Sequence, residues 1–127
     1  MGKPTNKMRL HIGLIIILSS LGQSCSKRDK QFVEVLNSPN KFHEKEIEII
    51  GIIHERPNDN AIYLTEYSGK KYAVWVDHLQ ILRMINSYEG IDGHKVNLKG
   101  EFDKNDKGHL GKYLGTLRDA KIIDVVE

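Results

Sequence analysis

The chain has 127 residues, enough for one domain, with 19 Lys and Arg, 17 Asp and Glu and a single cysteine. One thiol excludes an internal disulfide, so the fold must be stabilised without one. Residues 1–24 hold 3 basic and no acidic residues, and the remainder has 16 basic and 17 acidic residues, a net charge of −1. A near-neutral remainder has no general electrostatic attraction to nucleic acid, whose binding rests on many phosphate contacts.

Residues 1–24 have the three parts of a secretory signal peptide. Basic residues are followed by a mostly apolar stretch from Leu10 to Leu21, and small or polar residues come next. The apolar stretch is short for a transmembrane helix, which needs about 20 such residues. A buried helix of the folded domain is the alternative interpretation. We predict a signal peptide over residues 1–24 and a location in the bacterial cell envelope, at a membrane and facing the periplasm or the cell exterior.

Cys25 directly follows that segment. Its position resembles the lipobox of bacterial lipoproteins, in which a signal peptidase cuts before a cysteine that then receives lipid such as palmitate. The preceding residues depart from the usual pattern, because Leu21 stands one place early and Gln23 is bulky. We predict a lipid anchor on Cys25 and a polar tether over residues 25–30. A plain cleaved signal followed by an idle thiol is the alternative.

The folded domain is predicted over residues 31–127 and begins with a short helix. Apolar residues at positions 32, 33, 35 and 36 have helical spacing, and Pro39 ends the helix because the residue before a proline is pushed out of the α region. We expect the apolar side of this helix to pack across one end of a barrel. Residues 40–45 then form a turn, with Phe42 as an apolar plug.

The strand predicted at Glu46–Glu55 organises the rest of the chain. It begins with isoleucines on one face and glutamates on the other, and it becomes apolar on both faces after Gly51. A mid-strand glycine weakens a flat strand and suits one that coils sharply or carries a bulge, as in a small closed barrel. Two further strands are expected at Ala61–Glu66 and Lys71–Val76, and the three strands form an antiparallel meander.

A second helix is predicted after these strands. Asp77 is expected to cap it, and the helix runs from about His78 to Tyr88 with Gly90 as its stop. Leucine, isoleucine, methionine and tyrosine side chains give it a broad apolar stripe.

The last part of the chain supplies two more strands. The first, His94–Phe102, repeats the glycine-bearing pattern of the opening strand, with its glycine at Gly100. Residues 103–111 form a polar loop that contains glycine. The final strand is expected at Tyr113–Val126, with a break near Arg118-Asp119.

Three strands, a helix and two strands follow one another in the order of the oligonucleotide/oligosaccharide-binding (OB) barrel. We therefore predict a mainly β domain, a five-stranded OB-like Greek-key barrel with a helix between strands three and four and a short N-terminal helix. An open α+β sheet is the competing fold. The paired mid-strand glycines, Gly51 and Gly100, favour the barrel.

The residues also resemble a group of small bacterial envelope and cytosolic proteins with an OB-like domain. Their pattern has a helix ending in Leu-x-x-Pro, an aromatic residue and a lysine before a glycine-bearing strand, a strand ending in tryptophan, and a late Gly-His-x-Gly loop. The resemblance covers about residues 31–124 and departs at Glu44, where glycine is expected. It implies the fold, and no agreed biochemical function comes with it. The matching residues are Leu36, Pro39, Phe42, Lys45, Ile47, Ile49, Gly51, Trp75, Gly108, His109, Leu110, Gly111, Tyr113 and Gly115.

The stretch Gly108-His109-Leu110-Gly111 is the most site-like part of the sequence. Glycines on both sides of a histidine allow unusual backbone angles and would expose His109 at the mouth of the barrel, where OB loops meet ligands. In the structural alternative the glycines build a tight connection and His109 bonds a nearby carbonyl group. The possible ligand-binding residues are His109, Tyr113, Trp75 and Tyr72, and the structural glycines are Gly51, Gly100, Gly108 and Gly111.

Other chemistries have weaker signals. Aromatic and basic residues could stack on a single-stranded nucleic acid, but alternating aromatic residues also form cores and cross-strand pairs, and export would separate the protein from nucleic acid. Histidines at positions 43, 54, 78, 94 and 109 are not spaced as a ligand pair, so no metal and no cofactor is predicted. No nucleophile with its base is recognisable, and no catalytic residue is named. The stacking candidates are Tyr63, Tyr67, Lys70, Lys71, Tyr72 and Trp75.

These observations predict a non-enzymatic, lipid-anchored envelope protein. Its membrane contact is the lipid on Cys25, and its OB-like barrel binds a small molecule, a glycan or another protein. One alternative is an OB protein that binds single-stranded nucleic acid. The second alternative is a metal-binding or enzymatic protein centred on His109.

Overall fold

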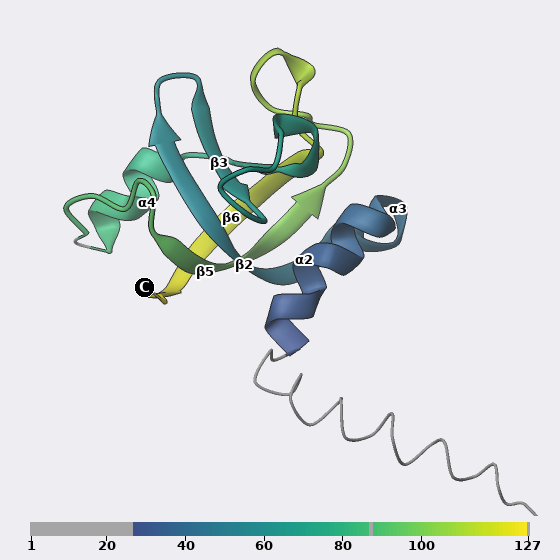
Figure 1. Cartoon of the computed structure of the whole chain (residues 1–127), viewed down its shortest axis with the longest axis horizontal. Coiled ribbons are helices and arrows are strands. Elements are labelled where there is room, and N and C mark those ends of the chain that lie inside the picture. Colours follow the sequence, from purple (N-terminus) through teal and green to yellow (C-terminus); the bar gives the residue numbers. More distant parts are fainter. Residues whose placement is uncertain (1–26, 87, 127) are drawn as a thin grey trace, which may run out of the picture.

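The computed structural model describes residues 27–86 and 88–126, so the predicted signal peptide and Cys25 lie outside the described residues. Figure 1 shows a barrel of strands flanked by short helices. The strands are β2 (Lys45–Arg56), β3 (Asp59–Tyr63), β4 (Val74–Val76), β5 (Lys95–Asp103) and β6 (Gly115–Val125). The helices are α2 (Lys27–Asn37), α3 (Pro39–Phe42) and α4 (Leu79–Ile85), and two 3-10 turns span Lys70–Tyr72 and His109–Gly111.

The strands close into a barrel in the order β2, β3, β4, β6, β5. All neighbours are antiparallel except β4 and β6, which run parallel. The chain passes through α4 and β5 between these two parallel strands. A five-stranded closed barrel with a helix between the third and fourth strands is the predicted OB-like Greek-key arrangement, which is thereby confirmed in place of the open sheet.

β2 contacts both of its neighbours in turn, and Gly51 stands where it changes from one to the other. The strand pairs with β5 as far as Ile52, and from Ile52 onward it pairs with β3. A strand must bend at such a changeover. Gly51 lies opposite Val96 of β5, and a Cβ atom at position 51 would overlap the carbonyl oxygen of Tyr63. The backbone of β3 therefore approaches this glycine so closely that a side chain would not fit.

Gly100 of β5 allows a similar approach by β6. The register of the β5–β6 pair shifts between Lys99 and Glu101, and β6 bends at Asp119, whose φ is 51°. A Cβ atom at position 100 would lie 2.8 Å from the carbonyl oxygen of Arg118. The predicted break in the last strand near Arg118-Asp119 is thus confirmed as a bulge.

The apolar core fills the barrel and includes the N-terminal helix. Phe32 and Val35 of α2 are fully buried, and Phe32 reaches the space left by the missing side chain of Gly51. Phe42 of α3 is partly buried against the same core, as expected of an apolar plug. The other buried core residues are Ile47, Ile49, Ile53, Ile62, Val74, Val76, Leu79, Ile91, Val96, Leu98, Phe102, Leu117 and Ile122.

The N-terminal boundaries differ from those predicted. α2 already begins at Lys27, so the helix also includes residues 27–30, which lie within the predicted tether. Pro39 opens α3, which occupies part of the predicted turn. A proline fits the first turn of a helix because its missing N–H would have no partner there. No helix in residues 27–86 and 88–126 is long and apolar enough to cross a bilayer.

The second and third strands of the meander are shorter than predicted, whereas β2 is one residue longer at each end. β3 ends at Tyr63, and Tyr72 lies in a 3-10 turn, so placing Tyr72 on a strand was wrong. The turn is closed locally, because the Tyr72 N–H donates to the Gly69 carbonyl at 3.0 Å and the Ala73 N–H donates to the Lys70 carbonyl at 2.9 Å. Alternation of side chains alone does not distinguish such a turn from the start of a strand.

The predicted cap of the second helix was also wrong. The Asp77 backbone N–H donates to the Leu117 carbonyl at 3.1 Å, so Asp77 prolongs the contact of β4 with β6. His78 is the N-cap residue of α4, with a left-handed backbone (φ 56°, ψ 35°) and no side-chain cap bond. α4 ends at Ile85, well before Gly90.

Glu44 has a left-handed backbone, with a φ of 65°, at the position where the resemblance expects glycine. Its N–H donates to the Phe102 carbonyl at 2.7 Å, which holds this conformation at the entry to β2. Because a Cβ atom is unfavourable in this region, Glu44→Gly should raise the free energy of unfolding by about 1 kcal/mol in chemical denaturation. The matched control, Glu46→Gly within β2, should lower it by about 0.5–1 kcal/mol. A loss of stability in both variants would contradict the left-handed assignment.

Candidate functional site

The outer face of β3 and β4 carries a second, smaller set of buried side chains, separate from the barrel core. On β3, Ala61 and Tyr63 alternate with the core residue Ile62, so they point to the opposite face of the sheet. On β4, Trp75 lies between two buried valines and opposite Ala61. We call the set formed by Ala61, Tyr63, Ala73, Trp75 and Tyr113, together with His109 stacked on it, the Trp75 cluster.

Aromatic rings make the main contacts of the Trp75 cluster. The rings of Trp75 and Tyr113 meet edge to face, with centroids 5.2 Å apart at 61°. The His109 ring stacks on Trp75 at 6.3 Å and 23°. Among the described residues, the His109 imidazole has no hydrogen bond, so its contact is this stack and not the carbonyl bond of the structural alternative. The structure therefore brings together three of the four predicted ligand-binding residues.

Gly108 lets the loop before β6 lie directly on Trp75. Its φ is 69°, and a Cβ atom there would be 2.7 Å from the Cβ of Trp75. Gly111 also has a positive φ, of 66°, with open space around it. Both glycines therefore allow the tight loop that the sequence suggested. Gly108 does so because a side chain would not fit against Trp75, and Gly111 does so through its backbone conformation alone.

Asp106 fixes the base of the same loop. Its carboxylate accepts a hydrogen bond from the Gly108 N–H at 3.1 Å and one from Arg118 at 2.9 Å, and its carbonyl accepts one from the Thr116 hydroxyl at 2.8 Å. The bond from the Gly108 backbone, with help from Thr116 and Arg118, holds the pKa of Asp106 below its ordinary value. The loop that carries His109 is therefore preformed.

A partly buried hydrogen-bond network around Asp59 includes two tyrosines of the cluster. One carboxylate oxygen of Asp59 accepts bonds from the hydroxyl groups of Tyr63 and Tyr113, both at 2.8 Å. The other oxygen lies 2.8 Å from Nδ1 of His54, whose ring also packs on that of Tyr63 at 4.1 Å. Asp59 thus connects the β2–β3 hairpin with the loop before β6.

The network sets the protonation of its members. Burial by itself would raise the pKa of Asp59, but the hydrogen bonds from His54, Tyr63 and Tyr113 outweigh it, and the pKa lies below its ordinary value. Burial, followed by the hydrogen bond to Asp59, raises the pKa of both tyrosines. Both tyrosines therefore keep their hydroxyl protons and donate them to Asp59. Because both oxygens of the Asp59 carboxylate are occupied, the carboxylate holds the two tyrosine rings in place.

The sequence did not single out Asp59 or His54 as site residues. The hairpin register pairs His54 with Ala61, which makes Asp59 a diagonal neighbour of His54 on the same face. Tyr63 is two residues beyond Ala61 and shares that face. A correct placement of the turn at Pro57-Asn58 would therefore have brought all three polar side chains together from the sequence.

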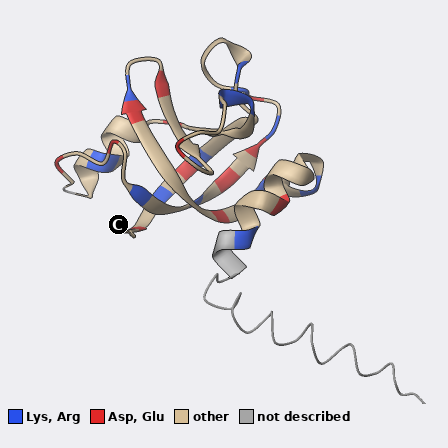
Figure 2. Cartoon of the chain, in the orientation of Figure 1, with Lys and Arg blue, Asp and Glu red and all other residues tan. Residues whose placement is uncertain are grey.

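Lysines approach the cluster from the surface. Nζ of Lys70 lies 5.9 Å from the centroid of the Tyr113 ring, and Nζ of Lys71 lies 5.1 Å from that of the exposed Tyr72. Figure 2 shows basic residues at the 3-10 turn that carries these lysines. Within the described residues Tyr72 makes no ring contact with Trp75. This fourth predicted residue is therefore not part of the Trp75 cluster, and its ring contacts Lys71 instead.

The histidines do not converge. His54 binds Asp59, and His43 lies 3.8 Å from Asp103. Within residues 27–86 and 88–126 no group of three or more His, Cys, Asp or Glu side chains could hold a metal ion. Comparison with known proteins adds no assignment, because no protein-family profile, no curated protein and no solved structure matches this chain.

Proposed function

We propose that the protein is a non-enzymatic, lipid-anchored protein of the bacterial envelope, and that its OB-like barrel binds an extracytoplasmic small molecule, glycan or protein at the Trp75 cluster. The observation that carries the binding part is the preformed stack of His109 on Trp75. OB barrels bind ligands with the face of their second and third strands and with the adjoining loops. Here those elements are β3, β4 and the loops before β3 and β6.

The chemistry of the cluster favours binding over catalysis. The half-buried indole of Trp75 and imidazole of His109 offer flat apolar surface, and Lys70 supplies a cation nearby. Tyr63 and Tyr113 are buried, and their hydroxyl groups donate to Asp59. They therefore pack against the binding surface and do not offer their hydroxyl groups to a ligand. A flat aromatic surface beside hydrogen-bonding groups is a common way to hold a sugar ring or a planar ligand.

The proposed lipid anchor and the proposed location in the envelope are both inferred from the sequence before residue 27. Fractionation of cells that express the full chain should place the protein with membranes, and its intact mass should show loss of residues 1–24 and a lipid on Cys25. The Cys25→Ala variant should lose the lipid mass and the membrane association. Unprocessed protein in the cytosol would contradict the envelope assignment.

The single tryptophan makes ligand binding directly measurable. Because Trp75 is the only indole, its fluorescence reports on the cluster alone. Titration with peptidoglycan fragments should change the emission, and His109→Ala should weaken the response. Unchanged emission together with no binding by calorimetry would contradict a glycan ligand.

Single-stranded nucleic acid is the second candidate, because Lys70 and Lys71 lie over aromatic rings beside Trp75. It predicts that oligothymidylate quenches Trp75 at low salt and that Lys70→Ala weakens this binding. The absence of quenching at low salt would remove this candidate.

A further inference from the structure

A groove lies between α4 and β6, and it shares no residue with the Trp75 cluster. β4 and β6 run side by side as far as Val76 and Leu117. Beyond this point β4 leaves toward α4, while β6 continues through its bulge at Asp119, and the two chains separate. The space between them measures about 300 Å³, the lower end of the size range of small-molecule sites. The residues around it are Asp77, His78, Ile81, Leu82, Ile85, Arg118, Asp119 and Ala120.

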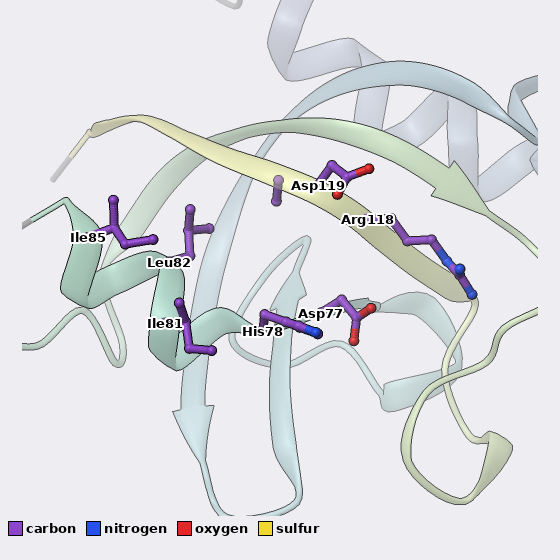
Figure 3. Close-up of a pocket in the computed structure, with 8 residues that line it drawn as sticks. Asp77, His78, Ile81, Leu82, Ile85, Arg118 and Asp119 are labelled. Carbon is purple, nitrogen blue, oxygen red and sulfur yellow. The ribbon is translucent and has the colours of Figure 1, made fainter.

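One wall of the groove is apolar and open to solvent. Ile81 and Ile85 of α4 are 58% and 74% exposed, whereas Leu82 is partly buried against the core. Figure 3 shows Leu82 and Ile85 on the side of α4 that faces β6. Ala120 of β6 also lines the groove. An apolar ligand body in this groove would cover isoleucine surface that now contacts water.

The other end of the groove is acidic. In Figure 3 Asp77 and His78, from the end of β4, lie at the same end as Asp119 of β6. Within the described residues, neither Asp77 nor Asp119 has an ion pair or a side-chain hydrogen bond. Two unpaired carboxylates beside apolar surface favour a positive charge.

Arg118 does not neutralise this end. Its guanidinium group binds Asp103 at 3.1 Å and Asp106 at 2.9 Å, both in the segment before β6. Figure 3 shows the Arg118 side chain directed away from α4. The unpaired acidic groups that line the groove are therefore Asp77 and Asp119, with the imidazole of His78 beside them.

We propose that this groove is a second binding site, which takes a small organic cation with an apolar body. The apolar body lies along Ile81, Leu82 and Ile85, and an ammonium group lies between Asp77 and Asp119. This arrangement discriminates by charge, because a carboxylate on the same body would meet two like charges. The site does not depend on the ligand proposed for the Trp75 cluster.

Three probes with one benzyl body and different head groups test the proposal: benzylammonium, benzyl alcohol and phenylacetate. Their dissociation constants are measured by saturation-transfer NMR on the protein purified in the form that cells make from the full chain. Benzylammonium should bind about threefold to tenfold more tightly than benzyl alcohol, as expected for two partly solvated ion pairs, and phenylacetate should bind least. Equal affinities, or no binding of benzylammonium, would overturn the proposal.

Variants assign the binding to the groove. The double variant Asp77→Asn with Asp119→Asn should abolish the preference for the ammonium probe, and asparagine tolerates the left-handed backbone of position 119. Ile85→Ser should weaken benzylammonium and benzyl alcohol equally. Asp124→Asn, on exposed surface of β6 outside the groove, is the matched control and should change neither constant. A preference that survives the double variant would overturn the site.

Discussion

Gly51→Val is expected to lower the free energy of unfolding by about 3 kcal/mol or more, or to prevent folding. The new side chain would meet the Tyr63 carbonyl oxygen on β3, Ile62 and the Phe32 ring of α2. Backbone atoms in a closed barrel cannot move aside without breaking a ladder. Thermal unfolding followed by circular dichroism should show a decrease in Tm of about 10–20 °C.

The control for this result is another glycine. Gly69 has open space around it and a φ of −82°, so Gly69→Val should leave Tm nearly unchanged. Gly100→Val should also destabilise the barrel, because its Cβ atom would meet backbone of β6. If Gly51→Val and Gly69→Val unfolded at the same temperature, the close pairing of β2 with β3 would be wrong.

Asp59→Ala is expected to lower the free energy of unfolding by about 3 kcal/mol at neutral pH, because buried tyrosine hydroxyl groups would lose a charged acceptor. Asp59→Asn retains one oxygen as an acceptor for Tyr63 and Tyr113, so its free energy of unfolding should fall by about half as much as that of Asp59→Ala. The measurement is urea unfolding. Glu66→Ala, on exposed surface, is the control and should change little.

The effect of Asp59 should depend on pH in one direction. Its carboxyl group has an ordinary pKa of 3.8, and its pKa in the folded protein is lower. The unfolded chain therefore takes up this proton first, so the stabilisation is complete above about pH 5 and is lost as the pH falls through the folded-state pKa. The difference between wild type and Asp59→Ala should be constant above that pH and shrink below about pH 4. A difference that grows on acidification would contradict the network.

The barrel could be predicted from the sequence because its strands carry a strong local pattern. In β2, Ile47 and Ile49 alternate with glutamates, and Ile53 continues the same face of the strand. All three isoleucines are buried. The two glycines could be predicted for the same reason, since each interrupts a run that would otherwise favour branched residues. Packing then made these local preferences agree with the global fold.

The parts that could not be predicted depend on partners distant in the sequence. Asp77 has the chemistry of a helix cap, yet its backbone bonds to Leu117, forty positions later in the chain. Tyr113 reaches Asp59 because β6, which follows Tyr113, pairs in parallel with β4. No residue spacing in the sequence predicts that contact. His109 was found because flanking glycines are visible locally, whereas the groove beside α4 exists only where two strands diverge.

The position of β6 between β4 and β5 has a consequence for the order of folding. β6 is the last strand along the chain, yet both of its neighbours need it to complete their ladders. Until β6 has been synthesised, β4 and β5 each have an open edge and the core of the barrel faces water. The core can therefore be closed off from water only when the chain is available as far as β6.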